Sequence, residues 1–415
     1  MSYSDTEVVI IGGGAAGIAA GRRLRQAGVG CLIVEARARL GGRAWTVTDA
    51  SGFAIDLGCG WLHSADRNPW SEVVERQGCT VDKTPPPWAR PSLPSGFSLK
   101  EQREYAAALD AFYERVGAAA QKEPDAALAE LLEPGCRWNG LIGAVVSFIS
   151  GGDIARVSAR DFDNYADNGV NWRVREGFGA TMAAYGRGVP AVLDCPVQRI
   201  DRSGQRLRIE TAKGAIVADR AIVTLPSTVI AENENLFAPA LPEKTQAAGN
   251  LPLGLNDKLF IALARPEEFE ADSRLLGRTD RSATASYHLR PFGRPMIEVF
   301  FGGRLARDLE AQGESAFFEF AAAELTAHFG GEFAGRVRPI RIHRWGADPF
   351  ARGSYSFALP GKSDCRAVLA APVDDRLFFA GEACSPHDFS TAHGGFLTGV
   401  AAAEQAMAAR RARLR

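Results

Sequence analysis

Several features that mark other classes of protein are missing from this sequence. Its 48 Lys and Arg residues balance 49 Asp and Glu residues over 415 positions, so there is no general basic field for nucleic acid. No uninterrupted apolar run is long enough to span a bilayer, and no signal peptide precedes the first expected strand, so we expect no membrane partner. The seven cysteines are odd in number, scattered and without a C-x-x-C pair. We therefore expect no disulfide framework, no metal site and a reduced, cytoplasmic setting.

What the sequence does contain is a glycine-rich stretch near its start. A run of β-branched residues at 8–11 predicts a buried strand, and G-x-G-x-x-G spacing follows at Gly12, Gly14 and Gly17. Gly12 permits a tight turn, Gly14 lets the backbone approach a pyrophosphate, and Gly17 lets the following helix pack against the strand. That helix, expected over 18–26, would present free N–H groups to the phosphates. The stretch therefore predicts a dinucleotide site.

An acidic residue and a second glycine pair extend this stretch. Glu35 ends a second expected strand, 31–34, and can accept hydrogen bonds from an adenosine ribose roughly twenty residues beyond the turn. The next eight residues, ARARLGGR, offer further backbone and guanidinium groups that can contact the same pyrophosphate. Here the chain resembles the FAD-dependent amine oxidase family, which carries an E-A-x-x-R-x-G-G-R segment at this place. The resemblance implies FAD, with contacts from Ala36, Arg37, Gly41, Gly42 and Arg43.

Later segments extend the resemblance to nearly the full length. The segment DLGCGW, residues 56–61, resembles the D-L-G-x-x-W segment that passes under the flavin, and residues 376–404 resemble the family's C-terminal F-A-G-E-x…H-G-A-x-x-S-G segment. A helix beginning at Gly394 and Gly395 would stabilise the negative charge of a reduced flavin. The resemblance implies further cofactor contacts at Ala16, Gly58, Gly60, Trp61, Val197, Trp345, Gly381, Glu382, Gly395 and Phe396.

The length of the chain favours two domains. We expect an α/β fold, in which a Rossmann-type FAD-binding domain of the glutathione-reductase kind is interleaved with an α+β substrate-binding domain. We assign 1–80, 175–250 and 365–415 to the FAD-binding domain, and 81–174 and 251–364 to the substrate-binding domain. The pattern predicts a connecting loop at 84–94, helices within 99–148 that include 125–132, hairpins within 192–224 and a helix over 314–329.

Four residues are candidates for chemistry. Lys258 opens an apolar strand, an unusual place for a solvated charge, and matches the family lysine that reaches flavin N5 through a water; the alternative is a structural ion pair. Tyr355 and Phe396 align with the two aromatics that sandwich the substrate amine, although Phe396 could equally be a core aromatic. His63 matches a histidine that faces the substrate nitrogen, or is a core or turn histidine.

Two positions refine the expected reaction. Ser354 stands where monoamine oxidases carry the cysteine bonded to the flavin, so the resemblance implies noncovalent FAD. Trp45 stands where L-amino-acid oxidases usually carry an arginine, which makes an α-amino acid a less favoured substrate.

The resemblance implies an amine oxidase with an amine and O2 as its small-molecule partners. Hydride would pass from the carbon next to the nitrogen to flavin N5, the imine would hydrolyse, and O2 would yield H2O2. The alternatives are a carotenoid-desaturase-like or protoporphyrinogen-oxidase-like enzyme and a binding protein like the GDP-dissociation inhibitors. The sequence leaves the amine and the oligomeric state open.

Overall fold

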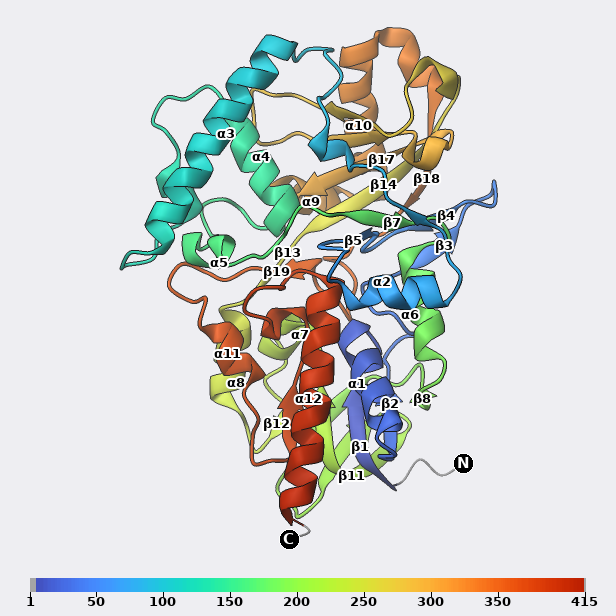
Figure 1. The fold of residues 1–415 in the computed structure, drawn as a ribbon, viewed down its shortest axis with the longest axis vertical. Coiled ribbons are helices and arrows are strands. Elements are labelled where there is room, and N and C mark those ends of the chain that lie inside the picture. The colour runs from blue at the N-terminus through green and yellow to red at the C-terminus, as the bar shows by residue number, and fades with distance from the viewer. Residues whose placement is uncertain (1–4, 414–415) are drawn as a thin grey trace.

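The computed structural model describes residues 5–413, which form two sheets stacked end to end with helices around them (Figure 1). The first sheet has the order β12-β9-β10-β11-β1-β2-β8, and β20 also pairs with β11. The β1–β2, β1–β11, β2–β8 and β11–β20 pairs are parallel, whereas β10 pairs antiparallel with β9 and with β11 in the two expected hairpins. The bounds of its strands are β1 (Asp5–Ile11), β2 (Cys31–Val34), β8 (Ala191–Val192), β9 (Val197–Asp201), β10 (Leu207–Thr211), β11 (Gly214–Val223), β12 (Phe237–Ala238) and β20 (Leu377–Phe379).

Both faces of β1 are buried, which explains its continuous run of apolar residues. Val9 and Ile11 belong to one core cluster, and Val8 and Ile10 belong to the cluster on the opposite face. Helices α1 (Ala15–Gln26) and α12 (Ala392–Arg413) cover this second face side by side (Figure 1). A Cβ atom at Gly399 would lie 2.2 Å from the carbonyl oxygen of Ala16, so glycine allows the two helices to approach closely. The C-terminal helix α12 thereby packs directly on α1, the helix that follows the glycine turn.

The second sheet is antiparallel throughout and has the order β15-β16-β17-β14-β18. One face packs on helices α9 (Gly303–Gln312) and α10 (Glu314–Phe329), with Tyr287, Phe301 and Phe317 in the shared core. The opposite face carries Lys258 and Phe300, which line a cavity. The bounds are β14 (Asn256–Leu263), β15 (Ser273–Leu276), β16 (Ser286–Leu289), β17 (Met296–Gly302) and β18 (Val337–Ile342).

A helical layer lies beside this second sheet (Figure 1). It consists of α3 (Leu99–Ala120), α4 (Asn139–Ser150) and α5 (Ala159–Asp163), which share one core cluster. The helix expected over 125–132 is wrong, because only a 3₁₀ turn, η2 (Leu128–Leu131), forms there. The N–H groups of Leu128 and Ala129 instead donate to the carbonyl groups of Val157 and Ile154, so this segment is paired with a neighbouring loop.

The remaining short elements connect the two sheets or cover their edges. The proline-rich 84–94 segment is a loop that contains one 3₁₀ turn, η1 (Pro87–Ala89). Within residues 5–413 we find no helix with the length and apolarity that a bilayer crossing requires. The other elements are β3 (Thr46–Thr48), β4 (Ala54–Asp56), β5 (Trp61–Leu62), β6 (Val81–Asp82), β7 (Trp172–Val174), β13 (Leu253–Gly254), β19 (Tyr355–Ser356), α2 (Pro69–Arg76), α6 (Phe178–Gly186), α7 (Ser227–Ala231), α8 (Pro242–Gly249), α11 (Cys365–Ala370), η3 (Pro266–Glu268), η4 (Pro291–Gly293), η5 (Gly331–Arg336) and η6 (Glu382–Cys384).

Candidate active site

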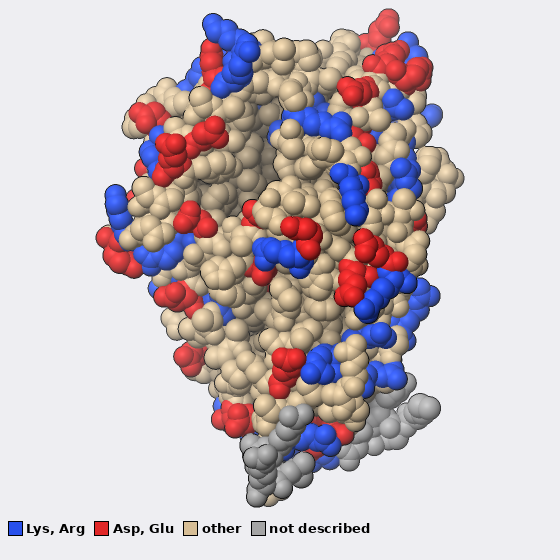
Figure 2. Space-filling view, viewed as in Figure 1, with Lys and Arg blue, Asp and Glu red and all other residues tan. Residues whose placement is uncertain are grey.

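A cavity of about 1250 Å³ extends from the glycine turn of the first sheet to the helical layer and the second sheet. Figure 2 shows this face of the molecule hollowed in its upper half. Of the residues proposed from the sequence, Gly17 and Phe396 do not line the cavity. The others do: Gly12, Gly14, Ala16, Glu35, Ala36, Arg37, Gly41, Gly42, Arg43, Gly58, Gly60, Trp61, His63, Val197, Lys258, Trp345, Tyr355, Gly381, Glu382 and Gly395.

The glycine turn after β1 forms one end of the cavity. Gly12 has a φ of +105°, in the left-handed region that favours glycine, and a Cβ atom at Gly17 would lie 1.9 Å from the Gly12 carbonyl oxygen. Gly14 is the N-cap of α1, and no side chain caps that helix. The N–H groups of the first helical turn therefore remain available to an anion such as a pyrophosphate.

Glu35, at the end of β2, is fixed by two backbone donors. The N–H of Gly13 lies 2.6 Å from Oε2, and the N–H of Arg37 lies 2.8 Å from Oε1. Each oxygen keeps a lone pair with which to accept a bond from a ribose hydroxyl. The Arg37 guanidinium is held beside the cavity by Asp348, with Nη2 2.6 Å from Oδ1.

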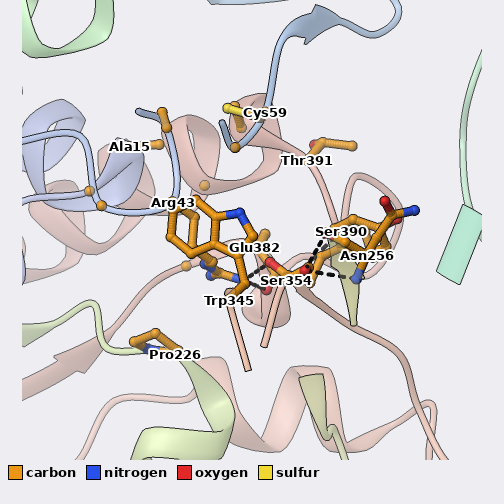
Figure 3. Close-up of a pocket in the computed structure, with 18 of the residues that line it drawn as sticks. Ala15, Arg43, Cys59, Pro226, Asn256, Trp345, Ser354, Glu382, Ser390 and Thr391 are labelled. Carbon is orange, nitrogen blue, oxygen red and sulfur yellow. Dashed lines mark hydrogen bonds and ion pairs between the residues drawn. The ribbon is translucent and has the colours of Figure 1, made fainter. Parts of the chain in front are cut away.

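Arg43 and Glu382 join the two glycine-rich ends of the chain (Figure 3). Arg43 Nη1 donates to Glu382 Oε1 at 2.9 Å and to the Ser354 carbonyl oxygen at 2.8 Å. Burial raises the pKa of Glu382, but the Arg43 charge and the hydrogen bond from Ser356 outweigh burial and lower it. Uncapped helix N–H groups, an anchored ribose acceptor and this ion pair thus line one continuous cavity, and these residues fit FAD.

Lys258 lines the cavity and is also part of a buried ion pair. Its Nζ lies 3.0 Å from Oε1 of Glu298 on β17. Burial raises the pKa of Glu298, but Lys258 and His288 together lower it from 4.5 to about 2. His288 continues the network, with Nδ1 3.5 Å from Glu298 Oε2 and Nε2 3.0 Å from Asp272 Oδ1. Lys258 is therefore a cavity residue and an ion-pair residue at once.

Tyr355 and Ser354 lie on the cavity wall where β19 begins. The Tyr355 hydroxyl donates to the Phe148 carbonyl oxygen at 2.6 Å, which fixes the ring against the end of α4. The Ser354 hydroxyl donates to the Asn256 carbonyl oxygen at 2.8 Å and accepts from the Asn256 N–H at 2.9 Å (Figure 3). A hydroxyl occupied by main-chain bonds fits the expected noncovalent cofactor.

His63 presents a neutral imidazole to the cavity. Its Nδ1 lies 2.6 Å from the Asn171 side-chain oxygen, which can only accept, so Nδ1 carries the proton and Nε2 is an acceptor. Burial lowers the pKa of His63, and this effect outweighs the opposing charge of Asp167. The ring faces Trp88 across 6.3 Å between centroids.

Comparison with known proteins decides between the possible functions. The sequence matches the family described as flavin containing amine oxidoreductase over residues 15–146 and 144–407. The chain belongs to this family. It is an FAD-dependent amine oxidase, and its family favours amine oxidation over the desaturase-like, protoporphyrinogen-oxidase-like and binding-protein alternatives.

Named relatives and solved structures agree with the family. The chain is 28% identical to polyamine oxidase 2 of Arabidopsis thaliana, over 97% of this chain and 88% of the relative. It is 26% identical to human lysine-specific histone demethylase 2, over 96% of this chain and 53% of that protein. Wild-type putrescine oxidase bound to putrescine superimposes with a TM-score of 0.78 at 16% identity, covering 97% of this chain and 99% of that one.

Phe396 and Trp45 of this amine oxidase are not among the residues that line the cavity. Phe396 is half-buried and packs edge-on against Trp70, with centroids 5.1 Å apart, and near Tyr185. The sandwich of Tyr355 and Phe396 stays a prediction, and Gly395 next to Phe396 does line the cavity. The Arg39 guanidinium covers the Trp45 ring at 4.5 Å. The expectation that Trp45 disfavours an α-amino acid likewise stays a prediction.

Sequence reasoning missed two small residues on the wall of the amine oxidase cavity, Cys59 and Thr391 (Figure 3). Burial raises the pKa of the Cys59 thiol to about 12, and its position between Gly58 and Gly60 was the available clue. Thr391 Oγ1 accepts from the Gly394 N–H at 2.9 Å. Threonine directly before a helix start is a common capping pattern, and this pattern could have revealed it.

Proposed function

We propose that the enzyme oxidises a monoamine with an apolar body. The observation that carries this proposal is His63, which lines the cavity, has a lowered pKa and binds Asn171 through Nδ1. Four carboxylates line the cavity: Glu35 and Glu382 lie at the dinucleotide end, Glu232 is paired with Arg352, and only Asp167 lies beside His63. A polycation would leave its remaining charges without partners. The apolar and aromatic residues that line the cavity include Trp88, which lies against His63, and Tyr113, Phe148, Ile149, Phe162, Phe300 and Tyr355.

The residues prepare the amine for oxidation. An arriving ammonium donates to His63 Nε2, and transfer of its proton to this ring leaves the lone pair that oxidation requires. The Tyr355 ring offers a π face to the cation on approach and holds the neutral amine in position afterwards. Lys258, fixed by Glu298, holds a positive charge beside Gly60 at the cofactor end of the cavity.

Bound in this cavity, FAD would supply the two-electron oxidation of the carbon next to nitrogen, with O2 as the final acceptor and H2O2 as the product. The imine product hydrolyses in water to an aldehyde. We also propose a reducing compartment for the enzyme, because all seven cysteines are free.

The proposal is tested with the purified holoenzyme and a matched amine panel. Linear monoamines, diamines including putrescine, and polyamines are mixed anaerobically with the enzyme while flavin absorbance is followed, and peroxide is measured in air. Bleaching by monoamines with kcat/KM above that of polyamines supports the proposal. Preference for the polyamines would overturn the substrate class, and flavin bleached by no amine would overturn the whole proposal.

A further inference from the structure

Arg274 lies on the cavity face of the second sheet, at the edge strand β15. It pairs with His288 on β16, and His288 pairs with Glu298 on β17, so these three side chains share one face with Lys258. Arg274 lines the same cavity as Lys258 but lies three strands away from it in the order of the sheet. The cavity face of this sheet therefore carries a second cation, far from the cofactor end.

The Arg274 guanidinium has no hydrogen-bond or ion-pair partner among the residues 5–413 that the structure describes. Other arginines on the cavity wall are paired: Arg37 with Asp348, Arg43 with Glu382, and Arg352 with Glu232. Arg274 is half-buried where it lines the cavity, and burial lowers its pKa. An uncompensated cation in such surroundings gains most from an anionic ligand.

A second unsatisfied donor lies on the same cavity wall. The Tyr105 hydroxyl on α3 is buried and has no hydrogen-bond partner within the described part of the chain. Leu276, two residues after Arg274 on β15, shares the core cluster of Tyr105, and both Tyr105 and Arg274 line the cavity. Phe97 and Trp138 pack edge-on against the Tyr105 ring, with centroids 6.0 Å and 5.8 Å away. Buried polar groups are normally bonded, so this hydroxyl is available to a ligand.

We propose that Arg274 and Tyr105 bind a carboxylate carried by the amine substrate. One guanidinium and one hydroxyl match a single carboxylate, which accepts several hydrogen bonds and balances one positive charge. The proposal rests on the proposed amine oxidation and specifies the far end of the same substrate.

The sheet geometry sets the length of that substrate. Lys258 and Arg274 are separated by three strand spacings and two residues along the strand, which corresponds to about 15 Å between their backbones. The arginine side chain spans part of this distance. The substrate class is thus an ω-amino carboxylic acid, whose carboxylate is several carbons from the oxidised carbon, rather than an α-amino acid.

The test measures binding and turnover separately in the holoenzyme. Straight-chain monocarboxylates, which lack an amine, are titrated while the flavin spectrum and the heat of binding are recorded. ω-Amino acids of increasing chain length, the corresponding alkylamines and α-amino acids are compared as substrates. The variants are Arg274→Met and Tyr105→Phe, and Arg304→Met on the exposed side of α9 is the matched control.

We expect Arg274→Met to weaken monocarboxylate binding about 10- to 100-fold, and Tyr105→Phe to weaken it about threefold to tenfold. Both variants should keep the wild-type kcat/KM for alkylamines, and Arg304→Met should match wild type throughout. If wild type and Arg274→Met bind carboxylates equally well, the carboxylate subsite is wrong. The proposed amine oxidation would not be affected by that result. If no amine is oxidised by the wild type, the proposed function fails, whereas carboxylate binding still reports on Arg274.

Discussion

Lys258 Nζ lies 3.0 Å from Glu298 Oε1, and both side chains are no more than 10% exposed. A buried pair gains little over an apolar substitute, but removal of one partner leaves the other charge uncompensated. The sequence alone placed Lys258 in an apolar strand without showing what balances it. The partner lies on β17, forty residues later in the sequence.

Glu298→Gln should therefore destabilise the holoenzyme by about 3 kcal/mol, because the Lys258 ammonium loses its counter-charge. Thermal and urea unfolding at pH 7 measure the effect. Glu314→Gln, at an exposed position of α10, is the control. It should change the free energy of unfolding by no more than about 0.5 kcal/mol. Equal stability of the two variants would show that the buried pair contributes nothing.

The same pair predicts an acid dependence of stability. The pKa of Glu298 is lowered from 4.5 to about 2, so the stability that its ionisation contributes is fully present above 4.5. This contribution is lost as the pH falls from 4.5 towards 2, where the folded protein takes up the proton. Wild type should consequently lose more unfolding free energy than Glu298→Gln across this interval, and parallel curves for the two proteins would contradict the assignment.

The proposed base can be tested through the pH profile of turnover. Burial lowers the pKa of His63 below its ordinary value of 6.5, so its Nε2 accepts a proton at neutral pH and becomes blocked only in acid. We expect His63→Gln to lower kcat/KM for monoamines about 10- to 100-fold and to remove the acid limb of the profile. His328→Gln, which lies on α10 and bonds Ser95, is the control. An unchanged acid limb in His63→Gln would assign that limb to another group.

Two glycines of the cofactor turn should respond differently to the same change. A Cβ atom at Gly14 would meet only the Gly42 Cα atom at 3.9 Å, whereas a Cβ atom at Gly17 would lie 1.9 Å from a carbonyl oxygen. Gly14→Ala should fold as the apoprotein with normal thermal stability but bind FAD at least about tenfold more weakly, because its methyl group occupies the phosphate approach. Gly17→Ala should lower apoprotein stability itself. Equal apoprotein stability in the two variants would contradict this distinction.

The elements that depend on neighbouring residues could be predicted from the sequence. The glycine turn, the two hairpins of the first sheet and the helix at Glu314–Phe329 were all predictable, because turn chemistry and periodicity are local. The contacts that the Phe396 side chain makes were not predictable. The helix start is rich in glycine and has no apolar stripe, so its sequence does not show which side faces the core. The lack of a partner at Arg274 depends on residues from separate strands and helices, which no sequence spacing reports.

The contacts of Phe396 make it possible to separate stability from turnover. The half-buried Phe396 ring packs against Trp70 and Tyr185, whereas Tyr355 lines the cavity. Phe396→Leu should lower stability by about 1 kcal/mol and leave kcat/KM near the wild-type value. Tyr355→Leu should lower kcat/KM about tenfold, because the π face that positions the amine is lost. A larger kinetic loss in Phe396→Leu than in Tyr355→Leu would restore the aromatic pair.

A buried carboxyl pair behind the cavity gives the last prediction. Asp257 accepts from the Trp345 N–H at 3.1 Å, and Glu310 accepts from the Gly346 N–H at 2.9 Å, so the pair holds the Trp345 loop from behind. Burial and then the charge of Glu310 raise the pKa of Asp257 well above 3.8. The buried Oδ2 of Asp257 has no hydrogen-bond partner within the described residues, so a negative charge on this carboxyl is poorly compensated.

A raised pKa means that the folded state binds this proton more tightly than the unfolded state, so the contribution of Asp257 to stability declines as the pH rises above 3.8. Asp257→Asn keeps an acceptor for the Trp345 N–H and removes the buried charge, so it should equal or exceed wild-type stability at pH 8. Asp257→Ala removes the acceptor and should cost about 1–3 kcal/mol. Urea unfolding at pH 6 and pH 8 measures both variants. A loss in Asp257→Asn as large as that in Asp257→Ala would show that the carboxyl is needed in its charged form.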